Sequence, residues 1–335
     1  MPTNHMRAVR SHLGKTAAGL LILTMLPIGL WSAEPPPSLR QQVEVLASGP
    51  MRVDKVKEGL YVVRGPFVPC TTRGCRPNGP DDGLIHEPGD VAIRVTPEGL
   101  ILIDDKYPDN LQEVLAQVRS VSSLPIRYLL NTHHHADHVS GNANLRALGV
   151  EIIAHRNIRE NFLRLKQPGE PNIVFADEGA LYLGGVEVRM IHYGRGHTNG
   201  DTVVYFPDLK TVHMGDLVID GMPVIDYNGG GSAISFIATI DKLLQIDFDT
   251  AIPGHGRVMT KAEVQAYRDR FQVMNDRMRT LATKGFPREQ LLSLDQARIH
   301  LKLAELGWEN SVSTTAFMTS IGQYYDEMAA PPQAP

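Results

Sequence analysis

The sequence predicts a protein of the α/β class, because extended segments come first and then alternate with helical ones. Two segments with the alternating pattern of strands, residues 56–63 and 91–95, precede the first helical pattern. Beyond residue 100, apolar runs typical of buried strands alternate with amphipathic helical stretches. The chain has 335 residues, of which 42% are hydrophobic and 21% charged, so it can bury a large core.

The expected elements follow one another along the chain. A continuous apolar strand over 100–103 leads to a helix over 110–121, which begins after the start signal Pro108-Asp109. The segment 261–284 predicts a long, exposed amphipathic helix. Further strands are expected at 126–130, 151–154, from Leu181, and at 186–191, 202–206, 211–213 and 250–252, with helices at 142–148, 157–166, 235–245 and within 288–328.

A dense set of histidine and carboxylate side chains follows the apolar run 126–130. His133, His135, Asp137 and His138 fall within six positions. Imidazole and carboxylate ligands suit one or two divalent metal ions such as zinc. Because His133 and His135 are two residues apart at a strand end, they can point the same way, and the next two can turn toward a second metal. The alternative is a solvated histidine-rich loop.

Three further candidate ligands stand at later strand ends, namely His197, Asp216 and His255. Each has a structural alternative, as the cap of a glycine turn, a helix N-cap and a residue of a tight Pro-Gly turn, respectively. Together they supply the ligands that the first loop lacks for two complete sites. Neighbouring glycines permit tight turns that aim these side chains inward, and they are Gly196, Gly215, Gly254 and Gly256.

This set of residues, in this order, resembles the metallo-β-lactamase superfamily over residues 56–257. The resemblance implies an αββα sandwich, with two mixed β-sheets packed face to face and helices outside. It also implies roles for single residues. The first zinc would be held by His133, His135 and His197, the second by Asp137, His138 and His255, with Asp216 bridging. Asp104 would brace a ligand histidine, its alternative being a turn residue, and Thr198 would support the same site.

The resemblance further implies a binuclear zinc-dependent hydrolase, with iron or manganese less expected. Two Zn²⁺ ions would share a bridging hydroxide that attacks the carbonyl of a small ester, lactone or amide-type substrate. One zinc would stabilise the developing oxyanion. Asp137, as the catalytic residue, would orient the nucleophile.

Departures from individual subfamilies leave the substrate open. The best-known subclass of zinc β-lactamases has a cysteine in the second site, and another has a serine near the position of Asp216. The aspartate here is similar to that of glyoxalase-type thioesterases and lactonases. Zinc β-lactamase action is the alternative, followed by a non-haem iron enzyme that oxidises sulfur compounds. Di-iron members typically have a glutamate where His135 stands.

Two loops are candidate walls of a substrate site. Cys70 and Cys75 lie in a loop rich in Gly and Pro, where an oxidising compartment would favour a disulfide, the alternative being a metal pair. The loop 221–232 follows Asp216, and its backbone is expected to be pliable enough to approach a ligand, the alternative being a simple connector. Its consecutive glycines are Gly229, Gly230 and Gly231.

The N-terminus has the pattern of an export signal. Arg7, Arg10 and Lys15 precede an uncharged run over 16–33. Cleavage after Ala33 would release a periplasmic or secreted protein, whereas an uncleaved run would anchor the chain in the inner membrane. The formal charge of −4 gives no sign of nucleic-acid binding. The expected segments are a signal or anchor (1–33), a linker (34–50), the hydrolase domain (51–260) and a helical extension packed on that domain (261–335).

Overall fold

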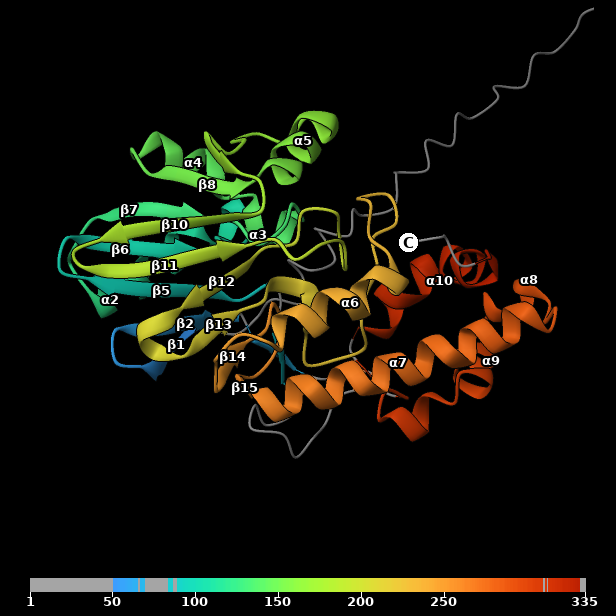
Figure 1. The fold of residues 1–335 in the computed structure, drawn as a ribbon. Coiled ribbons are helices and arrows are strands. Elements are labelled where there is room, and N and C mark those ends of the chain that lie inside the picture. The colour runs from blue at the N-terminus through green and yellow to red at the C-terminus, as the bar shows by residue number, and fades with distance from the viewer. Residues whose placement is uncertain are drawn as a thin grey trace, which may run out of the picture. The chain divides into compact units, whose positions relative to one another are not determined.

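Two mixed β-sheets lie face to face in the computed structural model, which describes residues 51–65, 67–69, 84–86, 89–309, 311 and 313–331 (Figure 1). Among these residues, one sheet has seven strands in the order β1-β2-β5-β6-β7-β8-β9. The other has six in the order β10-β11-β12-β13-β14-β15, and β3 and β4 pair separately. Both large sheets contain antiparallel and parallel neighbours.

The seven-stranded sheet begins antiparallel and ends parallel, because helices connect its later strands. Its strands are β1 (Arg52–Lys57), β2 (Leu60–Arg64), β5 (Val91–Thr96), β6 (Gly99–Ile103), β7 (Ile126–Leu130), β8 (Glu151–His155) and β9 (Ile173–Phe175). The six-stranded sheet comprises β10 (Glu178–Leu183), β11 (Val186–Ile191), β12 (Val203–Phe206), β13 (Thr211–His213), β14 (Thr250–Ile252) and β15 (Met259–Thr260). The small pair consists of β3 (Phe67–Pro69) and β4 (Leu84–His86).

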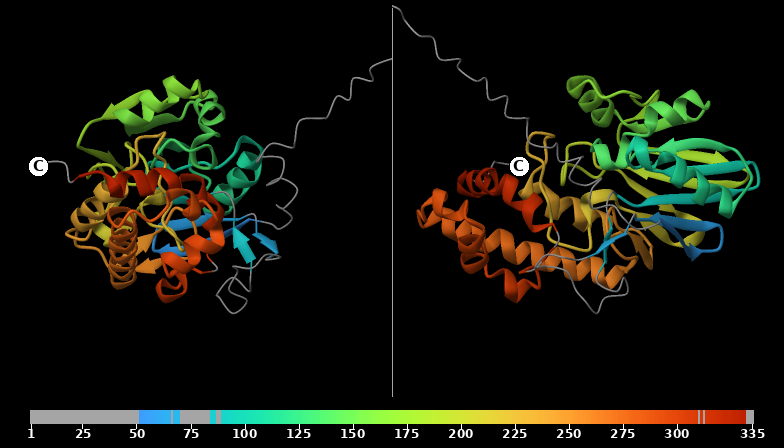
Figure 2. Two further views of the ribbon diagram at one scale, coloured as in Figure 1. Left: turned by 90° about the vertical axis from the view of Figure 1, so that its right-hand side faces the viewer. Right: turned by 180° about the vertical axis from the view of Figure 1, so that it is seen from behind.

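The helices lie outside the two sheets (Figures 1 and 2). Those of the first half are α2 (Leu111–Val121), α3 (Ala136–Val139), α4 (Asn142–Ala147) and α5 (Arg156–Leu165). Those of the second half are α6 (Ala233–Leu243), α7 (Lys261–Thr283), α8 (Arg288–Leu291), α9 (Leu294–His300) and α10 (Thr314–Ala329). Short 3₁₀ turns are η1 (Pro108–Asn110), η2 (Pro207–Leu209), η3 (Gly215–Leu217) and η4 (Leu303–Leu306).

Three apolar layers hold these elements together. Residues such as Ile101 of β6 and Val204 of β12 meet between the two sheets. Val114 and other residues of α2 cover the outer face of the first sheet. Residues of α6, α7 and α10, including Phe236 and Phe271, cover the second sheet. The predicted αββα sandwich is therefore confirmed, and burial of apolar area between its layers is the main source of its stability.

Two local expectations were wrong. The segment 56–63 is a hairpin rather than one strand, because Gly59 has a φ of +69° and reverses the chain between β1 and β2. Helix α7 is amphipathic but not simply exposed, since Tyr267, Phe271 and Met274 are fully buried. The helical elements expected within 288–328 are present as α8, α9, η4 and α10.

The loops that carry the candidate ligands emerge at one end of each sheet. In the first sheet β6 and β7 run parallel, so the residues after Ile103 and Leu130 share an edge. In the second sheet β13 and β14 run parallel, and β11 has the same direction because two antiparallel steps separate it from β13. The sheets thus place five strand ends together, as α/β folds commonly do at their binding sites.

No helix within the described ranges is long and apolar enough to cross a membrane. The expected signal or anchor, residues 1–33, and the expected disulfide partners Cys70 and Cys75 lie outside the described residues.

Burial of α7 predicts a large difference between two substitutions on that helix. Phe271 is fully buried, with its ring 5.1 Å from that of Phe236, whereas Val273 is 40% exposed. Phe271→Ala should lower the free energy of unfolding by about 3–5 kcal/mol because it leaves a cavity. Val273→Ala, the control, should cost less than about 1 kcal/mol. Urea unfolding of both variants measures this difference, and equal effects would show that α7 is not part of the core.

Candidate metal centre

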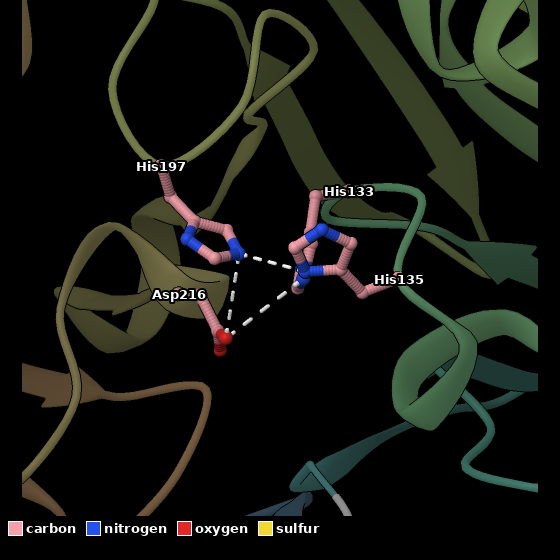
Figure 3. Close-up of side chains that lie close together, drawn as sticks. All are labelled: His133, His135, His197 and Asp216. Atoms are coloured by element: carbon pink, nitrogen blue, oxygen red, sulfur yellow. Dashed lines mark hydrogen bonds and ion pairs between the residues drawn. The ribbon is translucent and has the colours of Figure 1, made fainter. Parts of the chain in front are cut away.

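Four side chains from three loops converge on the first candidate site. The ligating atoms of His133, His135, His197 and Asp216 lie within 4.8 Å of one another. Figure 3 shows the His197 ring facing His133 and His135, with the carboxylate of Asp216 pointing toward the same space. The Nε2 atom of His197 is 2.9 Å from Nδ1 of His135 and 3.6 Å from Oδ2 of Asp216. This set offers three imidazole nitrogens and one carboxylate to a common centre.

A second group, Asp137, His138 and His255, lies beside the first. The Nε2 atom of His255 is 3.2 Å from Oδ2 of Asp137 and 3.2 Å from Nε2 of His138. Asp137 and His138 belong to the short helix α3, which directly follows His135. His255 comes from the loop after β14, so each group joins residues from both sheets.

Asp216 lies between the two groups and presents one oxygen to each. Its Oδ2 atom faces His133 and His197, while Oδ1 is 3.3 Å from Nε2 of His138 and 3.5 Å from Nε2 of His255. The adjacent backbone is tightly packed, since a Cβ on Gly254 would lie 1.9 Å from Oδ1. Only glycine therefore fits at position 254 beside this carboxylate.

Three of the histidines are each oriented by a hydrogen bond to the ring nitrogen that faces away from the candidate centre. His138 Nδ1 is 2.8 Å from Oδ2 of Asp104, His197 Nδ1 is 2.9 Å from the carbonyl oxygen of Val224, and His135 Nε2 is 2.9 Å from Oδ2 of Asp226. Such partners fix the tautomer and leave the other nitrogen available to a metal ion. The imidazoles are thus held in the state that a ligand requires.

Asp104, assigned from the sequence to bracing a ligand histidine, also binds the loop that carries His133. Its carboxylate accepts hydrogen bonds from the backbone N–H and the hydroxyl of Thr132. Its backbone is left-handed, with a φ of +62°, which costs a non-glycine residue about 1–3 kcal/mol. These hydrogen bonds stabilise that conformation.

Thr198, predicted to support the site, is bonded to Asp201 rather than to a ligand. Its backbone N–H and its hydroxyl both donate to the carboxylate of Asp201. These bonds close the turn that carries His197. Thr198 therefore acts on the site through the shape of this loop.

The donor set fits a metal ion because its ring nitrogens and carboxylate converge on one centre. Nε2 of His197 and Nδ1 of His135 lie 2.9 Å apart, so both rings present a nitrogen to that centre. The buried Nε2 of His133 has no hydrogen-bond partner among the described residues. A buried polar atom left in this state costs about 1–3 kcal/mol. A divalent cation at the centre would satisfy these atoms together.

The charge states agree with this interpretation. Burial lowers the pKa of His133 well below its usual range and that of His197 to about 4, so both rings are neutral at pH 7. Burial opposes ionisation of Asp216, but His255 and His138 outweigh it and hold the pKa of that carboxyl well below its ordinary value. Burial also lowers the pKa of His138, yet Asp137 and Asp216 raise it to about 10. Protonated histidines of the second group thus balance the negative charge of the carboxylates. A bound metal ion would neutralise that charge in their place.

Asp226 is a functional candidate that the sequence analysis missed. It lies in the loop 221–232, whose sequence signal was its run of glycines, and a lone aspartate there carries no motif. Its carboxylate accepts from the backbone N–H of Gly229 and contacts His135, and it is 3.6 Å from Nε2 of the buried His134. The ligating atoms of His134, His135 and Asp226 also lie within 4.8 Å of one another. Asp226 therefore connects this loop to the first candidate site.

The three glycines of this loop are closely packed rather than pliable. A Cβ on Gly231 would lie 2.3 Å from the carbonyl oxygen of His197, and one on Gly229 would lie 2.6 Å from the His134 ring. Gly230 has a φ of +78°, and its Cβ would lie 2.8 Å from Asn199. Their small size lets the loop approach the ligand loop. Their role as a wall of the substrate site stays a prediction.

Residues 91–255 match the family model described as the metallo-beta-lactamase superfamily. This segment, which carries every candidate ligand, belongs to the metallo-β-lactamase superfamily. The fold agrees, since a metallo-β-lactamase from Pontibacter korlensis superposes with a TM-score of 0.55 over 66% of this chain and 99% of its own, at 20% identity. The resemblance inferred from the sequence is confirmed.

Curated relatives of this superfamily member differ in their named activities. The α subunit of 2,4-dinitroanisole O-demethylase from a Nocardioides species is 28% identical over 42% of this chain, and the match spans only 44% of that subunit's length. The type 2 metallo-β-lactamase of Bacillus cereus is 26% identical over 51% of this chain and 68% of its own length. Membership of this superfamily supports the prediction of a metal-dependent hydrolase.

The contact between Asp226 and His135 predicts a loss of metal affinity on substitution. Asp226→Ala removes the acceptor that orients the His135 ring, so the metal affinity of the first group of ligands should fall about 10–100-fold. Competition with a chromophoric chelator measures this affinity. Asp247→Ala, which removes an exposed carboxylate paired with Lys210, is the control and should bind metal as the unchanged protein does. Equal affinity in both variants would contradict this role of Asp226.

Proposed function

We propose that this chain is a hydrolase that holds two divalent metal ions, zinc in the first instance, and cleaves the carbonyl group of a small ester, lactone or amide-type substrate. The observation that carries this proposal is the position of Asp216, which presents one carboxylate oxygen to each group of ligands. A carboxylate placed in this way is typical of a shared ligand between two metal ions. The family supports hydrolysis as the type of reaction.

The residues present divide naturally between two ions. His133, His135 and His197 would hold the first, and Asp137, His138 and His255 the second, with Asp216 between them. When bound, two such ions supply Lewis acidity and a nucleophile at neutral pH. The chain contributes the orientation of these ligands through Asp104, Asp226 and the carbonyl group of Val224.

The exposure of the ligands indicates where substrate would enter. The side chains of His133 and His138 are at most 1% exposed, whereas those of His135, Asp137 and His255 are 29%, 20% and 21% exposed. The site thus has a closed inner face and an open outer edge. A small molecule would approach at that edge, beside Asp137.

Asp137 is suited to orient an attacking water molecule. Burial would raise its pKa, but His138 and His255 outweigh this effect and hold the pKa below its ordinary value. Its carboxylate therefore stays ionised at neutral pH and can accept a hydrogen bond from water at the open edge. A group that orients water in this way must lie within hydrogen-bond reach of the nucleophile.

The β-lactam class is the second candidate, favoured by the similarity to the Bacillus cereus enzyme. The ligand set argues for esters and lactones first, because Asp216 replaces the cysteine expected in the best-known lactamase subclass. If the N-terminal segment exports the chain, as its sequence predicts, a glutathione thioester is disfavoured as substrate.

Substitution of Asp216 tests the shared carboxylate. Asp216→Ser and Asp216→Asn should each reduce the metal content from two equivalents toward one and lower kcat strongly, because neither side chain offers two anionic oxygens. Elemental analysis of the purified variants measures the content. Two equivalents bound at unchanged affinity in both variants would remove Asp216 from the ligand set.

A panel of four substrates tests the choice of substrate class. An aryl ester and an acyl-homoserine lactone should be hydrolysed faster than a cephalosporin or a glutathione thioester, measured as kcat/KM with zinc-loaded protein. Prior incubation with a chelator should abolish each activity, and added Zn²⁺ should restore it. Cephalosporin turnover above that of every ester would make the lactamase assignment the primary one.

A further inference from the structure

The loop 221–232 contacts the first group of ligands at three points and the neighbouring Gly196 at a fourth. Asp226 binds the His135 ring, and the carbonyl oxygen of Val224 accepts from the His197 ring. The backbone N–H groups of Asp226 and Ser232 donate to the carbonyl oxygens of His197 and Gly196 at 2.9 Å each. The positions of two ligand histidines thus depend on the conformation of this loop.

A single side chain from the C-terminal helix α10 is hydrogen-bonded to the second half of this loop. Glu327 accepts hydrogen bonds from the Tyr227 hydroxyl at 2.7 Å, from the Ser232 hydroxyl, and from the backbone N–H of Ala233 at 2.9 Å. These partners flank the glycine run on both sides. Burial and the nearby Glu327 raise the pKa of Tyr227, so its hydroxyl keeps the proton that it donates.

The C-terminal extension, residues 261–335, also makes hydrogen bonds to the beginning of the loop. The backbone N–H of Met222 lies 2.8 Å from the hydroxyl oxygens of both Ser311 and Ser313, and the Ser313 hydroxyl donates to the Met222 carbonyl oxygen. A Cβ on Gly221 would lie 2.8 Å from Oγ of Ser313. The extension is therefore hydrogen-bonded to the loop on both sides of Val224 and Asp226.

We propose that Glu327 is a positioning residue for the metal centre, and that the C-terminal extension sets the metal affinity of the first group of ligands through this loop. The path runs from Glu327 through Tyr227 and Ser232 to Asp226 and the Val224 carbonyl, and so to His135 and His197. Glu327 lies beyond residue 255, where the family match ends, so this support belongs to the part of the chain outside that match. The proposal rests on the proposed function only in requiring that the first group binds a metal ion.

The test compares two neighbouring carboxylates of α10. Glu327→Ala removes all three bonds to the loop, and Glu327→Gln keeps one acceptor oxygen. Asp326→Asn is the matched control, because Asp326 pairs with Arg288 of α8 and not with the loop. Tyr227→Phe removes one of these bonds from the loop side. Its effect therefore cannot arise from misfolding of α10, which stays unchanged in this variant.

Three measurements separate positioning from general stability. Chelator competition gives the affinity for each Zn²⁺ equivalent, the visible spectrum of bound Co²⁺ reports ligand geometry, and urea unfolding of metal-free protein reports stability. Glu327→Ala should weaken one of the two equivalents, the one held by the first group, about tenfold and change the Co²⁺ spectrum. Glu327→Gln and Tyr227→Phe should be intermediate, and Asp326→Asn unchanged.

Loss of metal-free stability in Glu327→Ala, with unchanged metal affinity and an unchanged Co²⁺ spectrum, would overturn the proposal and leave Glu327 a purely structural residue. Failure of the unchanged protein to bind any metal would overturn the proposed function as well. Two metal ions bound normally by every variant would overturn only the role of Glu327.

Discussion

The candidate metal centre depends on one largely buried carboxylate, that of Asp216, which is 11% exposed and lies among imidazole rings carried by loops of both sheets. A buried charge is tolerated only where opposite charges or hydrogen-bond donors surround it. Here His138 and His255 face one oxygen, and His133 and His197 face the other. Because these partners come from loops far apart in the sequence, the charge is stabilised only when both sheets are in place. The fold and the site are therefore formed together.

The packing on each side of Asp216 explains how this position is held. Met214 and Leu217, which flank it, belong to the same apolar cluster as Phe271 of α7 and Phe317 of α10. On the other side, Asp104 lies at the end of the buried strand β6 and joins His138 to the loop of His133. Well-packed cores resist small displacements, so ligands attached to them keep their distances. The rigid elements thus supply the preorganisation that a metal site requires.

The sequence indicated most of the candidate site because the possible ligands are marked by local patterns. His133 to His138 form a dense run, and His197, Asp216 and His255 each stand beside a glycine at a strand end, which the structure brings together. The supporting residues could not be found in the same way. Asp226 and Glu327 are single carboxylates in unremarkable surroundings, and their partners lie 91 and 95 residues away in the chain. Only the folded arrangement shows which of many acidic residues faces a ligand.

The same distinction applies to the fold. Apolar runs such as 100–103 predicted strands directly, because burial on both faces leaves an unbroken hydrophobic signal. The hairpin at Gly59 was missed, since β-like alternation continues through a tight turn. The burial of α7 was missed because its hydrophobic residues are interspersed with charges that line the exposed face, while the partner helix α10 lies far along the chain. Since α10 also carries Glu327, the helix that completes this apolar layer is the one that reaches the loop beside the metal ligands. A change in the packing of the extension would thus be transmitted to His135 and His197 through a few hydrogen bonds, so core packing and ligand geometry are coupled in this chain.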